Sequence, residues 1–106
     1  MLINFLKYRM IAGALMGKYY AHMGDRERAM ACLRTSVEVL EKKKCRFFTV
    51  GIPRIVHLHL LLLFHLGAGE LLQRMLDATV KWDHSTPILK QLREEFTKKL
   101  AIVSQP

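Results

Sequence analysis

The stretch MGKYYAHMGDRERAMACLRTSV, residues 16–37, decides the fold that we expect for this chain. Five residues recur in it at offsets of three, four, five and four positions: Gly17, Tyr20, Gly24, Ala29 and Leu33. Gly17 would let two helices cross closely, and Gly24 would end the first helix, because a left-handed cap suits a residue without a Cβ. Ala29 and Leu33 lie one turn apart and would face back onto the first helix. The stretch therefore predicts a helical hairpin.

This pattern resembles the tetratricopeptide repeat, which has Gly and Tyr on its first helix, Gly at the turn and Ala on its second. The similarity covers residues 13–44, where Gly13 replaces an aromatic residue of the family and lysines 42–44 replace a closing proline. The resemblance implies a stack of hairpins that acts as an adaptor, scaffold or chaperone. In size and repeat type alone, the chain is also similar to chaperones of bacterial secretion-needle subunits. The alternative is any α-hairpin with small residues at its crossing point.

Length and composition predict an all-α fold in a single domain, residues 1–106. A chain of 106 residues is short enough for one domain, and Leu, Met and Ala favour helices over strands. We expect stacked helix–turn–helix hairpins with an amphipathic C-terminal capping helix. The expected parts are a first hairpin at 2–44, a loop at 45–52, a second hairpin at 53–82 and the terminal helix at 86–103.

Local signals support these boundaries. Asp25 is placed to cap the second helix of the first hairpin, and Pro87 suits the first turn of the terminal helix. The second hairpin repeats the four, five, four spacing of the first, with its turn glycine at Gly67, in the order Leu63, Gly67, Leu72 and Leu76. The terminal helix either caps the stack or packs into a partner's groove.

Positive charge is concentrated in the first half of the chain. Residues 1–54 contain eleven lysines and arginines and four acidic residues, whereas residues 55–106 contain six and five. The tightest cluster is Lys42, Lys43, Lys44 and Arg46, with Phe47 and Phe48 beside it. Such a cluster attracts an acidic protein or phosphates, and its aromatic rings can stack on bases. The structural alternative is a solvated helix C-terminus, where cations interact favourably with the helix dipole.

These features predict a protein-binding module. About three helical-repeat units are usually needed for stability, and two hairpins with a cap leave apolar surface for another chain to cover. The expected partner is a helical or extended segment, with an acidic one among the candidates, bound between the first helices of the hairpins. The predicted binding residues are Tyr19, His22, Arg26, Lys42, Lys43, Lys44, Arg46, Phe47 and Phe48. Alternatives are a basic nucleic-acid-binding domain and a fragment of a larger regulator.

The sequence offers little for catalysis. It contains no glycine-rich phosphate loop and no recognisable nucleophile motif, so we expect neither an enzyme nor a cofactor. His57 and His59 are two residues apart, and on a helix their rings diverge. We therefore expect no metal site, and interpret these rings as satisfied groups at the edge of the core.

Cysteine usage and hydropathy bear on the compartment. Cys32 and Cys45 are too few for a disulfide framework and lack metal-ligand spacing, which favours a reducing compartment. The apolar run at residues 55–66 is shorter than the roughly 20 residues of a membrane-spanning helix. We expect a cytoplasmic protein. The absence of acidic residues from 1–24 makes mitochondrial targeting the alternative.

Overall fold

The computed structural model describes residues 2–42, 52–82 and 86–104, and this part of the chain consists of helices joined by short turns. The elements are α1 (Leu2–His22), α2 (Arg26–Lys42), α3 (Ile52–His65), α4 (Gly69–Ala78), the 3₁₀ turn η1 (Val80–Trp82) and α5 (Pro87–Ser104). No strand occurs among these residues, which confirms the predicted all-α class.

The predicted boundaries differ from the observed ones at the start of α3, at the end of α4 and, by one residue at each end, in α5, which is Pro87–Ser104 instead of 86–103. Helix α3 begins at Ile52, which was assigned to the loop at 45–52, and the rest of that loop lies outside the described residues. Helix α4 ends at Ala78, and the last residues of the predicted second hairpin form the 3₁₀ turn η1 rather than α-helix. The buried Thr79 hydroxyl donates to the Leu76 carbonyl at 2.7 Å, which satisfies a carbonyl at the end of α4.

The two hairpin turns have the same backbone geometry. Gly24 and Gly67 both have positive φ, 79° and 69°. After α1, the Gly24 amide donates to Ala21 and the Asp25 amide to Tyr20. After α3, Gly67 donates to Phe64 and Ala68 to Leu63. These paired bonds form the Schellman motif, which requires a left-handed residue. The turns are 43 positions apart, farther than the 34-residue period of tetratricopeptide repeats.

Side-chain capping differs between the hairpins. The Asp25 carboxylate accepts the Arg28 amide at 3.1 Å, so Asp25 is the N-cap of α2 as predicted. Its counterpart before α4 is Ala68, which makes no side-chain cap.

Glycines set the distance between α1 and α2. A Cβ at Gly17 would lie 3.0 Å from Cδ2 of the buried Leu33, and a Cβ at Gly13 would overlap the Ser36 hydroxyl. Gly13 is therefore a second position at which α1 and α2 approach each other closely. The sequence indicated only that Gly13 stands where the tetratricopeptide family has an aromatic residue. Two glycines one turn apart let the backbones pack with no side chain between them.

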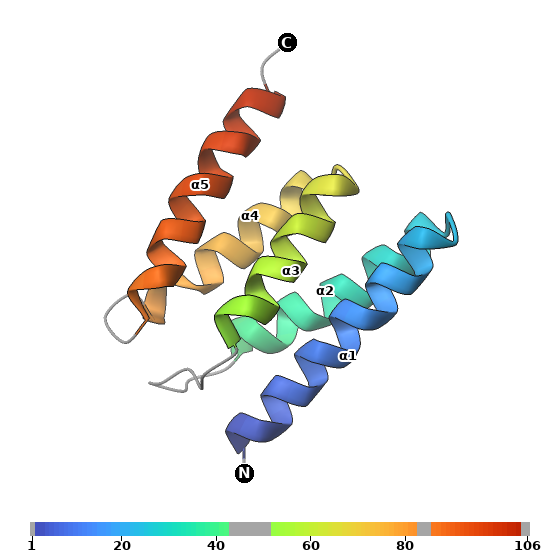
Figure 1. Cartoon of the computed structure of the whole chain (residues 1–106), viewed down its shortest axis with the longest axis horizontal. Coiled ribbons are helices and arrows are strands. Elements are labelled where there is room, and N and C mark those ends of the chain that lie inside the picture. The colour runs from blue at the N-terminus through green and yellow to red at the C-terminus, as the bar shows by residue number, and fades with distance from the viewer. Residues whose placement is uncertain (1, 43–51, 83–85, 105–106) are drawn as a thin grey trace.

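The second hairpin lies against the first, with α3 beside α1 and α4 beside α2, and α5 packs on α3 and α4 (Figure 1). The largest fully buried side chains of this core include Met10, Leu33, Leu40, Leu60, Leu72, Met75 and Phe96. Helices α1 and α5 therefore form the two ends of the molecule.

Polar contacts join the hairpins at both edges. The Arg26 guanidinium donates two hydrogen bonds to the Leu66 carbonyl, at 3.0 and 3.1 Å. Arg74 holds the Glu41 carboxylate with bonds of 2.7 and 3.2 Å. The Lys81 ammonium donates to the Leu40 carbonyl at 2.9 Å. Arg26 and Lys81 thus satisfy carbonyls near the C-terminal ends of α3 and α2.

Candidate protein-binding face

Helix α1 exposes a continuous apolar face. Five of the nine exposed large apolar side chains among the described residues belong to α1 or directly follow it, and they are 45–68% exposed: Tyr8, Leu15, Met16, Tyr19 and Met23. Their spacing of three, four or seven to eight residues places them on one side of a helix. We call these five residues the α1 face.

The opposite side of α1 is also apolar, and it is buried. Met10, Ala14 and Gly17 are fully or almost fully enclosed against the rest of the molecule. A helix that is apolar around its whole circumference is normally buried on all sides. Here only the inner half is covered by the described residues, so the α1 face meets solvent.

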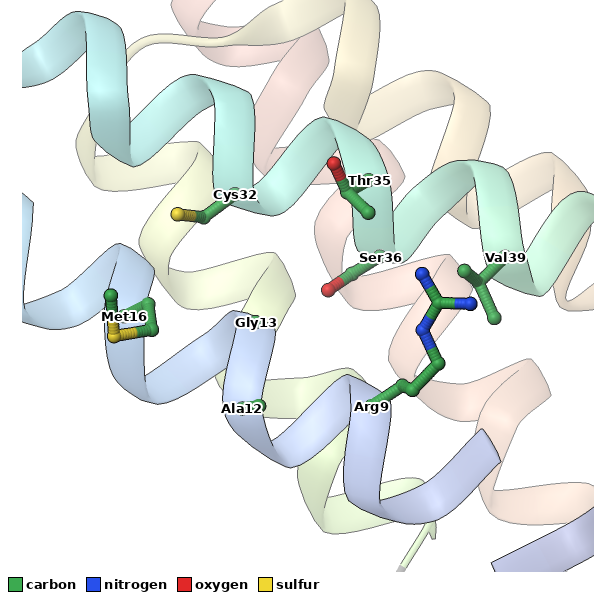
Figure 2. A pocket seen from close by; sticks show the side chains of 8 residues that line it. All are labelled: Arg9, Ala12, Gly13, Met16, Cys32, Thr35, Ser36 and Val39. Atoms are coloured by element: carbon green, nitrogen blue, oxygen red, sulfur yellow. The ribbon is translucent and has the colours of Figure 1, made fainter. Parts of the chain in front are cut away.

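A groove lies between α1 and α2 at this end of the molecule (Figure 2). Arg9, Ala12, Gly13 and Met16 line it from α1, and Cys32, Thr35, Ser36 and Val39 line it from α2. The Arg9 side chain extends from α1 toward α2, and the Cys32 thiol points toward α1 (Figure 2). Among the described residues that line the groove, Arg9 is the one with a charge.

A second depression lies between α1 and α3. It is lined by Lys18, Ala21 and His22 from α1 and by Leu62 and His65 from α3. His22 also lines an adjoining hollow with Leu15, Lys18 and Tyr19. This is the side on which the sequence predicted a partner, between the first helices of the two hairpins.

The structure divides the predicted binding residues between two ends of the first hairpin. Tyr19 and His22 lie together near the turn, and both are exposed. Arg26 is nearby, although its guanidinium is bonded to the Leu66 carbonyl. Lys42 is at the other end of α2, about 24 Å from Arg26 for 16 residues of helix. Lys43, Lys44, Arg46, Phe47 and Phe48 lie outside the described residues.

Sequence reasoning missed most of the α1 face. Of its five residues only Tyr19 was predicted, because the hairpin signature draws attention to the inner side of α1. The available signal was a second apolar line on the same helix, with Leu15 and Met23 at four-residue intervals on either side of Tyr19.

The histidines of α3 differ in environment. His59 is fully buried; its Nδ1 lies 2.7 Å from the Ile55 carbonyl, and its Nε2 has no hydrogen-bond partner. Burial lowers the pKa of His59, and the bond to Ile55 offsets this only in part. The interpretation of satisfied rings at the core edge is therefore wrong for His59. His57 is half-buried with its ring centroid 5.8 Å from that of Phe96, and His65 is exposed.

Comparisons with known proteins give no relative: no family model, curated protein or solved structure matches this chain. Within the described ranges, no three His, Cys, Asp or Glu side chains are grouped so that they could hold a metal ion. None of the described helices combines the length and the apolar character needed to cross a bilayer.

Proposed function

We propose that this chain is a protein-interaction module of the adaptor, scaffold or chaperone type, which binds a helical or extended segment of another protein. The exposed α1 face carries the proposal. Large contiguous apolar patches are uncommon on the surfaces of monomeric proteins and typically mark interaction sites. Two hairpins and a final helix are also compatible with a short tetratricopeptide-like stack, in which neighbouring units cover each other's faces.

The composition of the α1 face supports a protein as the ligand. Tyr and Met are enriched at protein–protein interfaces, and the face contains two of each, Tyr8 and Tyr19 with Met16 and Met23. Burying a large apolar side chain fully is worth about 1.5–3 kcal/mol. A partner that covers the whole face thus gains a driving force for association, whereas the isolated chain leaves these side chains in water.

A matched pair of variants tests the proposal. The double variant Leu15→Ser, Tyr19→Ser removes apolar surface from the α1 face. The control Ile88→Ser, Ile102→Ser removes exposed apolar surface from α5, where the two side chains are 50% and 70% exposed. We expect the α1 variant to lose proteins that co-purify with the tagged wild-type chain, and the control to retain them. Circular dichroism checks that both variants remain helical.

Two results would contradict the proposal. One is a wild-type chain that is a stable monomer with no bound protein and no concentration-dependent association. The other is retention of the same partners by the α1 variant. A salt titration separates the nucleic-acid alternative, because binding to phosphates weakens steeply as salt rises, whereas association through apolar surface changes little.

A further inference from the structure

Two adjoining hollows form one concave surface between α1 and α3. Lys18 and His22 of α1 line both hollows, so the hollows are continuous. Their lining combines apolar side chains with groups that can donate hydrogen bonds. We call this the Lys18 surface, and the residues that matter for its chemistry are Leu15, Lys18, Tyr19 and His22 of α1 with Leu62 and His65 of α3.

The spacing of these residues suits a helix of another protein. On α1 they occupy positions i, i+3, i+4 and i+7, and on α3 they occupy positions i and i+3. Such positions form a row along one side of a helix. Helices α1 and α3 lie side by side (Figure 1), so a third helix can place a ridge of side chains between the two rows. The two-residue side-chain period of an extended segment does not match them.

Neither helix that forms the Lys18 surface contains an acidic residue. Both α1 and α3 lack Asp and Glu over their whole lengths. The side chains of Lys18, His22 and His65 are exposed. None of the three makes a hydrogen bond or an ion pair with another side chain in the described part of the chain. The positive charge of Lys18 is therefore not balanced from within the two helices that hold it.

The acidic residues near the two hairpin turns do not line the Lys18 surface either. Asp25 is 3.4 Å from the Arg28 side chain and caps α2. Glu70 of α4 interacts electrostatically with Arg74. Glu27, in the first turn of α2, lies outside the lining of both hollows. A ligand is therefore needed to bring negative charge to this surface.

Cations near the C-terminal end of a helix can also serve the helix itself, because they interact favourably with its last carbonyls. In this molecule those carbonyls already have other donors. Three carbonyls at the end of α1 accept backbone amides of the turn. The Leu66 carbonyl, directly after α3, accepts both bonds from Arg26. Capping of α1 and α3 therefore does not occupy the polar groups of the Lys18 surface.

From this juxtaposition we infer that the Lys18 surface binds an acidic amphipathic helix of another protein, with apolar side chains against Leu15 and Tyr19 and carboxylates beside Lys18. The Lys18 ammonium supplies charge, and the imidazoles of His22 and His65 supply N–H donors for carboxylate oxygens. The inference rests on the proposed function and specifies the location and the chemistry of the partner. Opposite charge would also increase the association rate.

Charge and shape favour this occupant over three others. In a symmetric dimer the same surface of two copies would meet, and its described lining offers a lysine and no acidic residue on either side. A nucleic acid requires several cations to neutralise its phosphates, and this lining contains one lysine and no arginine. An anionic bilayer supplies negative charge, but its flat surface does not fill a depression between two helices.

Two peptides test the charge preference of this surface. Both form amphipathic helices of about 20 residues, roughly 30 Å long, with the same leucine stripe and either Glu or Lys beside it. Fluorescence anisotropy measures the dissociation constant of each peptide. We expect the Glu peptide to bind about tenfold more tightly at low ionic strength, and the difference to shrink as salt screens the exposed charges. The ring resonances of His22 and His65 in NMR spectra should shift with the Glu peptide, which locates it on the molecule.

Charge reversal at Lys18 should exchange this preference. The variant Lys18→Glu should bind the Glu peptide more weakly and the Lys peptide more tightly than the wild type does. The control Lys90→Glu changes net charge by the same amount at an exposed position of α5 and should behave as the wild type. Circular dichroism establishes that each variant is folded.

The outcomes separate this inference from the proposed function. Equal dissociation constants for the two peptides, no binding of either, or a preference for Glu that survives in Lys18→Glu each overturn the inference. The proposed function is decided independently by co-purification with the α1 variant, which keeps Lys18. Shifts of the two histidine ring resonances with phosphatidylserine vesicles or oligothymidylate, in place of the Glu peptide, would assign the surface to phosphates and overturn the inference. Shifts that grow with protein concentration alone, together with a dimer in sedimentation, would assign it to a second copy and also overturn the inference.

Discussion

The two end helices, α1 and α5, differ in the kind of surface that they present to solvent. Helix α5 buries Leu89, Leu92 and Phe96 and turns charged residues outward, including the exposed Lys90, Glu94, Glu95 and Lys98. Its exposed isoleucines, 88 and 102, are 14 residues apart and form no continuous face. Helix α1 buries Met10 and Ala14 and presents the α1 face to solvent. A stack of helices needs polar outer faces at its ends, so α5 has the properties of a cap and α1 does not.

Aromatic packing strengthens the α5 end. The Phe96 ring is fully buried, with the rings of His57 and Phe64 at centroid distances of 5.8 and 6.4 Å in edge-to-face arrangements. The Lys99 ammonium lies 4.7 Å from the Phe96 centroid and 3.2 Å from the Glu95 carboxylate. Polar groups thus cover apolar ones on α5, whereas Tyr19 and Leu15 on α1 are each 57% exposed.

Removing the main anchor of α5 should have the largest effect on stability. We expect Phe96→Ala to lower the free energy of unfolding by about 3–5 kcal/mol, because it leaves a cavity in the core. Tyr19→Ala, at the α1 face, should change it by no more than about 0.5 kcal/mol. Urea denaturation followed by circular dichroism measures both. Similar losses of unfolding free energy for the two variants would contradict the view that α5 is anchored in the core while the α1 face is exposed to solvent.

The close approach of α1 to α2 gives the next largest effect. We expect Gly17→Val to cost about 1–3 kcal/mol, because the new side chain would press on the buried Leu33. Ala12→Val places the same side chain on the exposed side of α1, where only the helix propensity changes, by about 0.5 kcal/mol. Thermal unfolding of the pair measures the difference. Equal melting temperatures would show that α1 is not held by this contact.

Helix α3, between the two ends, should respond to acid through His59. Its folded pKa is lowered by burial, so the unfolded chain binds more protons once the pH falls below about 6.5. Stability is then full above that pH and declines as the pH falls toward the folded pKa. Melting temperatures at pH 7.5, 6.5 and 5.5 measure this, with the exposed His22 as the control site.

Two substitutions complete the pH test. His59→Gln should reduce the fall in melting temperature between pH 7.5 and 5.5, and His22→Gln should leave that fall unchanged. Glu41 should affect stability at lower pH than His59. Its folded pKa is depressed, so its contribution to the free energy of unfolding is present above the ordinary glutamate pKa and is lost as the pH falls through the folded pKa. An acid response that persists in His59→Gln would assign it to another group.

The smallest effect tests a predicted binding residue. We expect Arg26→Ala to cost about 0.5–1.5 kcal/mol, the net value of a typical hydrogen bond, because its guanidinium caps the Leu66 carbonyl. If that is its main role, the variant should retain partners that Leu15→Ser, Tyr19→Ser loses. If the variant loses its partners while its stability is unchanged, Arg26 contributes to binding, as the sequence predicted.

The sequence predicted the hairpins because their signals are local. Gly24 and Gly67 end helices through left-handed backbone, Asp25 caps α2 with its own side chain, and Pro87 begins α5. Each depends on residues a few positions apart, so each is visible without knowledge of the fold. The sequence did not indicate where α4 ends: residues 79–82 belong to the predicted hairpin, and yet the chain changes there to η1, where Lys81 reaches the Leu40 carbonyl across the hairpins.

What the sequence determined by itself was therefore the set of helices, their turns and the amphipathic character of α5, since steric limits and periodicity act over a few residues. The hairpin signature indicated through Gly17 which side of α1 faces α2, but tertiary structure alone decided that the apolar side with Leu15 and Tyr19 would remain exposed. It also decided that Arg26 would serve as a cap, that His59 would be enclosed, and that Arg9 and Val39, distant in sequence, would line one groove. Antiparallel pairing of α1 and α2 brings those residues together, and the glycines at 13 and 17 make that pairing close.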